Sequence, residues 1–206
     1  MKISAPADDK KNEPRNIPDE FKVVSVMDLL EEYIKSGRIK LNTHKYHEAY
    51  TVHDPCNYVR KSQMAFGQST GEQSRWIAQQ CIDPSLYREM CDDPMNNLCC
   101  GAGGGAWAMP YDDERLAYGK MKADQIKATG AEIVVAPCHN CRDQIMKGLP
   151  KVHDMGNYKE TLYLWELVSL CLDYEPWSEA EQAKGHELRD AQFESDGVEL
   201  ETEEEE

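Results

Sequence analysis

The chain lacks the apolar segments that would place it in or across a membrane. Its 206 residues contain no run approaching the roughly 20 apolar residues of a bilayer-spanning helix. Residues 1–20 are polar and lack the apolar core of a secretory signal, so we expect a disordered leader or linker there. The sequence therefore indicates a protein of the reducing cytoplasm, where cysteines serve metal binding or redox chemistry more often than disulfides.

The chain also has little positive charge. It contains 23 lysines and arginines against 38 aspartates and glutamates, which gives a net charge of −15. This balance argues against nucleic acid as a partner, because basic residues hold the phosphate backbone. Residues 175–206 carry 13 of the acidic side chains, opposed only by Lys184 and Arg189. We therefore expect one domain over residues 21–175, followed by an acidic disordered tail over residues 176–206.

Two segments of the chain follow the same order of features. Residues 48–53 predict a strand that ends at a proline just before Cys56, and residues 131–136 predict a buried strand that ends at a proline just before Cys138. A helical pattern follows each cysteine, so each helix would point its N-terminus at the sulfur and favour the thiolate. Ligands in α/β sheets collect at the carboxyl ends of parallel strands. We expect an α/β fold with a small parallel sheet flanked by helices and the cysteines at that edge.

Helical patterns account for most of the remaining domain. Ser25 and Asp28 suggest a cap for the first helix, and Gly130 suggests the end of a later one. The expected helices lie at residues 23–34, 58–65, 74–80, 112–129, 139–147 and 158–172.

The most distinctive stretch joins two adjacent thiols to a glycine run, from Cys99 through Gly105. Cys56 lies 42 residues before this pair, and a Cys-x-x-Cys pair at Cys138 and Cys141 begins after 37 intervening residues. Four roles are open to these sulfurs: buried apolar side chains, disulfides, a zinc site or an iron–sulfur cluster. We assign the first role to the three remaining cysteines, Cys81, Cys91 and Cys171.

The pattern of the five cysteines favours the iron–sulfur cluster over zinc. A tetrahedral zinc site needs four ligands, and two adjacent cysteines strain a chelate on one ion. A cluster offers several irons, and a glycine-rich backbone can approach it closely and offset its negative charge. The ordinary ferredoxin run C-x2-C-x2-C-x3-C is absent, so we expect an unusual cluster. A zinc-stabilised interaction module without redox activity stays open as the alternative.

These motifs resemble the CCG cysteine-rich domain of the B-type subunits of heterodisulfide reductase, and most of all DsrK-type subunits of the DsrMKJOP complex. The resemblance covers residues 23–175 and extends to the flanks His53-Asp54-Pro55 and Ala136-Pro137. It implies a noncubane [4Fe–4S] cluster at which a disulfide or trisulfide is reduced in dissimilatory sulfur metabolism. The implied metal ligands are Cys56, Cys99, Cys100, Cys138 and Cys141. The implied cofactor-binding backbone is that of Gly101, Gly103 and Gly104.

The resemblance also implies partners. These are a DsrC-like protein substrate, further subunits that hold the chain at the inner face of the cell membrane, and a ferredoxin-type electron donor. We expect the donor on a separate chain or a missing N-terminal half, because the chain carries no ferredoxin run. An alternative is the electron-transfer subunit of a glycolate, lactate or glycerol-3-phosphate dehydrogenase. His53 and His139 lie beside implied ligand cysteines. They could donate protons to the products or hydrogen-bond to the cluster ligands. The alternative is that each is a turn residue bonded to the backbone.

Overall fold

The sheet of the domain has three short parallel strands. A computed structural model describes residues 24–90, 93–103 and 105–197. Within them the sheet runs in the order β1 (Tyr50–Val52), β2 (Ile133–Val135) and β3 (Glu160–Leu162). Val52 pairs with Val135, and Val135 pairs with Leu162, so all three strands end at one edge. The expected α/β fold with a small parallel sheet is confirmed, and β1 and β2 lie inside the predicted segments.

Helices and single turns connect the strands. The α-helices are α1 (Val26–Lys35), α2 (Ser62–Phe66), α3 (Gly71–Cys81), α4 (Asp112–Tyr118), α5 (Lys120–Thr129), α6 (His139–Asp143), α7 (Leu164–Cys171) and α8 (Glu179–Ser195). Two π-helical turns are η1 (Asn57–Lys61) and η5 (Gln144–Gly148). The 3-10 turns are η2 (Pro84–Leu86), η3 (Pro94–Asn96), η4 (Ala106–Ala108) and η6 (Leu149–Lys151).

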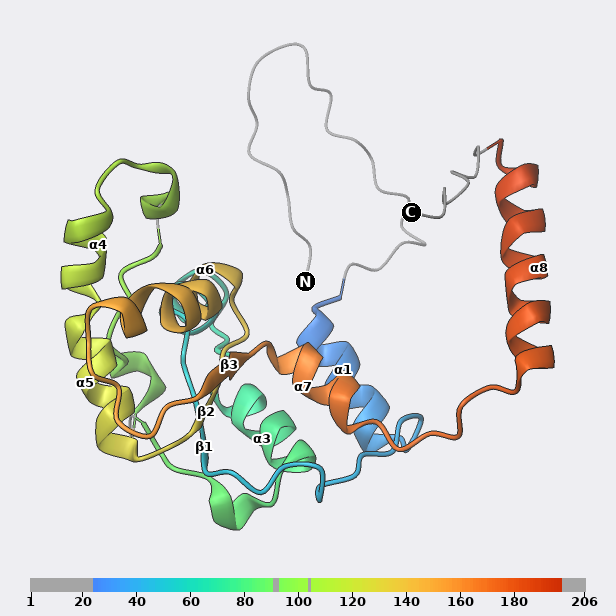
Figure 1. The fold of residues 1–206 in the computed structure, drawn as a ribbon, viewed down its shortest axis with the longest axis horizontal. Helices are drawn as coiled ribbons and strands as arrows, with labels where there is room; N and C mark the ends of the chain where they lie inside the picture. The colour runs from blue at the N-terminus through green and yellow to red at the C-terminus, as the bar shows by residue number, and fades with distance from the viewer. Residues whose placement is uncertain (1–23, 91–92, 104, 198–206) are drawn as a thin grey trace. The chain divides into compact units, whose positions relative to one another are not determined.

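Helices cover both faces of the sheet (Figure 1). On one face, α1, α3 and α7 pack over a core that includes Ile133 and Val135. On the other, α5, α6 and η5 enclose a second core that includes Val134, Cys100 and Cys141. Successive residues of β2 thus point into different cores, which explains why this strand reads as a continuous apolar run.

The expected helix over residues 112–129 is two helices, because the chain breaks at Gly119. A Cβ atom at Gly119 would lie 2.3 Å from Leu149 Cδ2 and 3.0 Å from the backbone oxygen of Cys100. Only glycine leaves room for the Cys100 peptide at this point. The break between α4 and α5 therefore seats the Cys-Cys segment against the domain.

The expected helix over residues 158–172 is wrong in its first half, which forms β3. Thr161 and Leu162 are buried next to β2, and pairing with β2 outweighs the local helical pattern. The helix α7 starts only after Tyr163, whose backbone N–H donates to the Glu166 carboxylate at 3.0 Å.

One compact unit ends at Asp173, and a second begins at Tyr174. The expectation of disorder over residues 176–206 is wrong for Glu179–Ser195, which form α8. Ser178 Oγ accepts from the Glu181 N–H, and the Glu181 carboxylate accepts from the Ser178 N–H at 2.8 Å, so a capping box starts this helix. The leader over residues 1–20 and the last nine residues lie outside the described residues, and the domain limits 21–175 stay a prediction.

Candidate metal centre

The candidate centre lies beyond the carboxyl ends of β1 and β2. Cys56 follows β1 by four residues, and Cys138 follows β2 by three. Because Val52 and Val135 are paired in register, both cysteines reach the same edge of the sheet. Cys138 is the N-cap of α6, and backbone N–H groups of Asn140 and Cys141 stabilise its thiolate, as the sequence predicts.

The structure brings Cys100 and Cys141 into direct contact and places the other three predicted ligands near them. Cys100 Sγ and Cys141 Sγ lie 3.3 Å apart, and both side chains are buried. Hydrogen bonds join Cys138 to Cys141 and Cys99 to Cys100. The Cys99 sulfur also accepts from the Gly101 N–H at 3.3 Å. Cys56 is close enough to Cys99 to act on its pKa. Cys56, Cys99 and Cys138 are partly exposed, so the set opens to solvent on one side.

Contacts between the sulfurs divide them into thiols and thiolates. Hydrogen bonds from Cys141 and Cys99 hold the pKa of Cys100 far below its usual range. The hydrogen bond from Cys141 lowers the pKa of Cys138 to about 6. The same contacts raise the pKa of Cys99 and of Cys141. The contacts therefore favour the thiolate at Cys100 and at Cys138, and binding of a metal would release the remaining thiol protons.

Cys138 is expected to be the most readily alkylated of the exposed thiols in the metal-free protein. Its reaction with iodoacetamide should rise from pH 5 and level off above pH 7, with a midpoint near the pKa of about 6. Cys99 should react slowly throughout this range, because its pKa is raised. Peptide mass spectrometry after timed alkylation measures both rates. Equal alkylation rates at Cys99 and Cys138 at pH 7 would contradict the opposite pKa shifts of these two thiols.

A buried ion pair fixes the loop that carries Cys56. Arg75 on α3 donates to both Asp54 carboxylate oxygens, at 2.7 Å and 2.8 Å, and both side chains are buried. Glu89 also accepts from Arg75, at 2.8 Å and 3.0 Å. The Asn97 side chain donates to the backbone oxygen of Asp54, which ties the Cys99 segment to the same loop. Sequence reasoning missed Arg75 and Asn97, because no local pattern links them to the cysteines.

Glycine is required at Gly101 for a reason the sequence did not reveal. Its φ is +91°, and a Cβ atom there would lie 2.8 Å from the backbone oxygen of Arg115. The buried Gln144 side chain would also lie 3.4 Å from that Cβ atom, and its oxygen accepts from the Arg115 guanidinium. A Cβ atom at Gly103 would meet none of the described atoms within 4 Å. The cofactor-binding role of Gly103 stays a prediction, and Gly104 lies outside the described residues.

Alanine is expected to be tolerated at Gly103 and not at Gly101. Gly101→Ala forces a left-handed φ and a backbone clash, so it should lower the free energy of unfolding by about 2–3 kcal/mol. Gly103→Ala should change it by no more than about 0.5 kcal/mol. Urea unfolding of the metal-free variants measures both. A loss of similar size at the two positions would refute the backbone requirement at Gly101.

The two histidines occupy different environments. His53 is 1% exposed, and burial lowers its pKa. His139 is exposed, and its Nδ1 bonds to the Tyr163 hydroxyl, whose ring stacks on it at 6.1 Å between centroids. His53 thus lies inside the centre and His139 at its rim.

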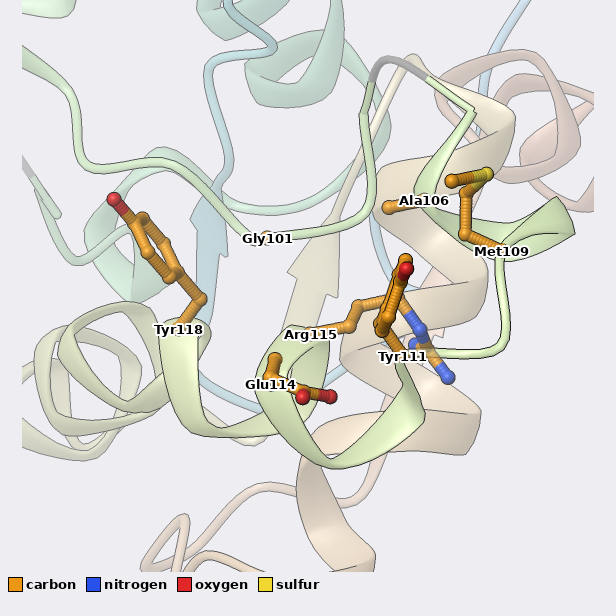
Figure 2. Close-up of a pocket in the computed structure, with 7 residues that line it drawn as sticks. All are labelled: Gly101, Ala106, Met109, Tyr111, Glu114, Arg115 and Tyr118. Carbon is orange, nitrogen blue, oxygen red and sulfur yellow. The ribbon is translucent and has the colours of Figure 1, made fainter.

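A cleft of about 260 Å³ has Gly101, the residue after Cys100, in its lining (Figure 2). Met109, Tyr111 and Tyr118 line it and are more than half exposed. Trp107, which follows the glycine run, donates its ring N–H to the Asn140 backbone oxygen at 3.4 Å and so lies over the start of α6. The glycine run is therefore bordered by a cleft lined mainly by apolar side chains.

The donor set fits a metal cluster better than a single ion. The predicted ligand set has five cysteines, one more than a tetrahedral zinc site takes. Cys81 and Cys171 are free thiols joined by a hydrogen bond in the core on the opposite face of the sheet, where apolar side chains are expected. Cys91 lies outside the described residues.

Comparison with known proteins agrees with this geometry. The CCG family, described as a cysteine-rich domain, matches residues 50–146, a range that includes all five cysteines of the centre. Residues 50–146 are therefore similar to the CCG domain. The strands β1 and β2 both lie within that range, and β3 follows it.

Two archaeal proteins are similar to this chain over most of its length. An uncharacterised iron–sulfur protein of Methanococcus maripaludis is 30% identical over 149 residues, which are 72% of this chain and 28% of that protein. One of the subunits of the dihydromethanophenazine:CoB–CoM heterodisulfide reductase of Methanosarcina mazei is 30% identical over 139 residues, which are 66% of this chain and 31% of that relative. The chain therefore spans less than a third of the length of either relative.

Among the described residues no helix is both long and apolar enough to cross a bilayer.

Proposed function

We propose that the chain holds a noncubane [4Fe–4S] cluster and passes electrons through it to a sulfur–sulfur bond. The proposed ligands are Cys56, Cys99, Cys100, Cys138 and Cys141. The observation that carries the proposal is the contact of Cys100 Sγ with Cys141 Sγ, which are buried and 3.3 Å apart, beside the edge of the sheet that Cys138 also reaches. The names of the two relatives, an iron–sulfur protein and a part of a heterodisulfide reductase, support it.

The proposed reaction converts a disulfide, two electrons and two protons into two thiols. A bound cluster supplies the electrons. The cleft would receive the apolar part of the substrate, because Met109 and Tyr111 line it. His139 at the exposed rim is placed to hand a proton to a departing thiolate, and Tyr163 orients its ring.

The proposed substrate is a disulfide or trisulfide on a small DsrC-like protein, as for DsrK-type subunits. The chain covers less than a third of the length of its relatives, so we propose that further parts of the assembly lie outside this sequence. These are a ferredoxin-type electron donor and the subunits that hold the assembly at the inner face of the membrane. Under this proposal the partly exposed sulfurs and the cleft face the substrate protein.

The test is thiol formation under strict exclusion of oxygen. The cluster-loaded chain is mixed with the CoB–CoM heterodisulfide as a small probe while titanium(III) citrate is kept in excess, because each disulfide needs two electrons and one cluster passes them one at a time. We expect thiols to form in proportion to the protein, and His139→Ala to slow their formation on the order of 100-fold. Cys171→Ala, which alters a cysteine in the opposite core, should react at the normal rate. An iron-loaded chain that gives no thiol above the protein-free rate would overturn the proposed reaction.

A further inference from the structure

His53 is a buried polar side chain without an oxygen or nitrogen partner. Its side chain is 1% exposed, and among the residues that the structure describes its ring nitrogens meet only the Cys100 sulfur. An unsatisfied buried polar group costs about 1–3 kcal/mol, so most such groups in folded proteins are bonded. The ring nitrogens of His53 therefore call for an explanation.

The imidazole faces the two buried sulfurs of the centre. A ring nitrogen of His53, Cys100 Sγ and Cys141 Sγ all lie within 4.8 Å of one another. The two sulfurs are themselves only 3.3 Å apart. One nitrogen and two sulfur donors thus converge on the same small space.

The backbone holds the ring in this place. The His53 N–H donates to the Val135 backbone oxygen at 2.9 Å, which extends the pairing of β1 with β2 by one residue. The next residue, Asp54, is fixed by its buried ion pair with Arg75. His53 is therefore presented from a rigid strand end, which is how metal ligands are usually positioned.

We propose that His53 is a nitrogen ligand of the metal centre, beside Cys100 and Cys141. The assignment rests on the proposed function for the identity of the cluster, but the nitrogen and sulfur donors are present whatever metal occupies the centre. Imidazole is a neutral donor where thiolate is negative, and histidine ligation raises the reduction potential of iron–sulfur centres. Replacing this ligand should therefore lower the potential of the bound cluster.

The first experiment looks for the nitrogen directly. Full-length protein is labelled with ¹⁵N-histidine, loaded with its cluster without oxygen, and studied by pulsed EPR in a paramagnetic state. We expect a strong coupling to one histidine nitrogen, lost in His53→Gln and kept in His139→Gln. His139→Gln is the matched control, because it changes the other histidine beside a proposed ligand. A loaded protein without that coupling, or His53→Gln that retains it, would overturn the assignment.

The second experiment does not depend on iron. Metal-free protein is titrated with Co²⁺, whose visible absorption bands report the balance of nitrogen and sulfur ligands. Without His53 the bands should shift toward those of an all-thiolate site, and Co²⁺ affinity should fall on the order of 10–100-fold. Unfolding curves of both variants confirm that they are folded. Unchanged bands and affinity in His53→Gln would contradict the proposal. A cobalt shift in a protein that binds no iron would keep His53 as a ligand and overturn the cluster instead.

Discussion

Asp54→Ala is expected to lower the free energy of unfolding by about 3 kcal/mol. The substitution leaves Arg75, a buried guanidinium, without its bidentate carboxylate. Loss of one member of a buried ion pair costs about 3–5 kcal/mol. We expect the lower end of this range, because Glu89 continues to accept hydrogen bonds from Arg75.

Chemical unfolding of the metal-free protein measures this loss, with Asp124→Ala as the control. Asp124 pairs with Lys120 on the surface, so its removal should cost less than about 1 kcal/mol. Asp54→Ala should also weaken Co²⁺ binding, because the Asp54 loop carries His53 and Cys56. A loss at Asp54 no larger than the loss at Asp124 would show that the ion pair does not hold this loop.

Cys100→Ala is expected to remove nearly all iron from the protein. Cys100 is the sulfur that contacts both Cys99 and Cys141, so its loss disconnects the adjacent pair from the Cys-x-x-Cys pair. Since loss of residues that merely support a ligand costs 10–100-fold in metal affinity, loss of this ligand should reduce iron per chain by at least about tenfold.

The control for Cys100→Ala is Cys171→Ala. Cys171 is also a buried cysteine, but it lies in the core on the opposite face of the sheet. Its substitution removes similar volume and should leave the iron content unchanged. Equal iron in the two variants, after anaerobic purification, would show that Cys100 is not a ligand.

Sequence reasoning succeeded where one local pattern specified the answer. The strands β1 and β2 are each followed within three residues by a proline and then a cysteine, so the shared edge followed from the rule for parallel strands. Sequence reasoning failed for β3. Its three residues lie next to a helical pattern, and they form a strand only because they pair with β2 in the folded chain. It also failed for residues 179–195, where acidic composition suggested disorder although Ser178 and Glu181 form a capping box.

The contacts that position the site were not accessible from the sequence. Asp54 and Arg75 are 21 residues apart, and Cys100 and Gly119 meet only in the folded chain. The two histidines look alike in sequence, each beside a proposed ligand. Only the structure separates a buried ring that faces two sulfurs from an exposed one bonded to Tyr163.

The central claim is that the converging cysteines hold an iron–sulfur cluster. The most direct measurement is the iron, zinc and acid-labile sulfide content of anaerobically purified protein, together with its EPR spectrum after mild oxidation in the presence of thiol. The account predicts about four iron and four sulfide per chain and a paramagnetic cluster signal. One zinc per chain without sulfide or an EPR signal would contradict it, and would leave the five cysteines as a structural metal site.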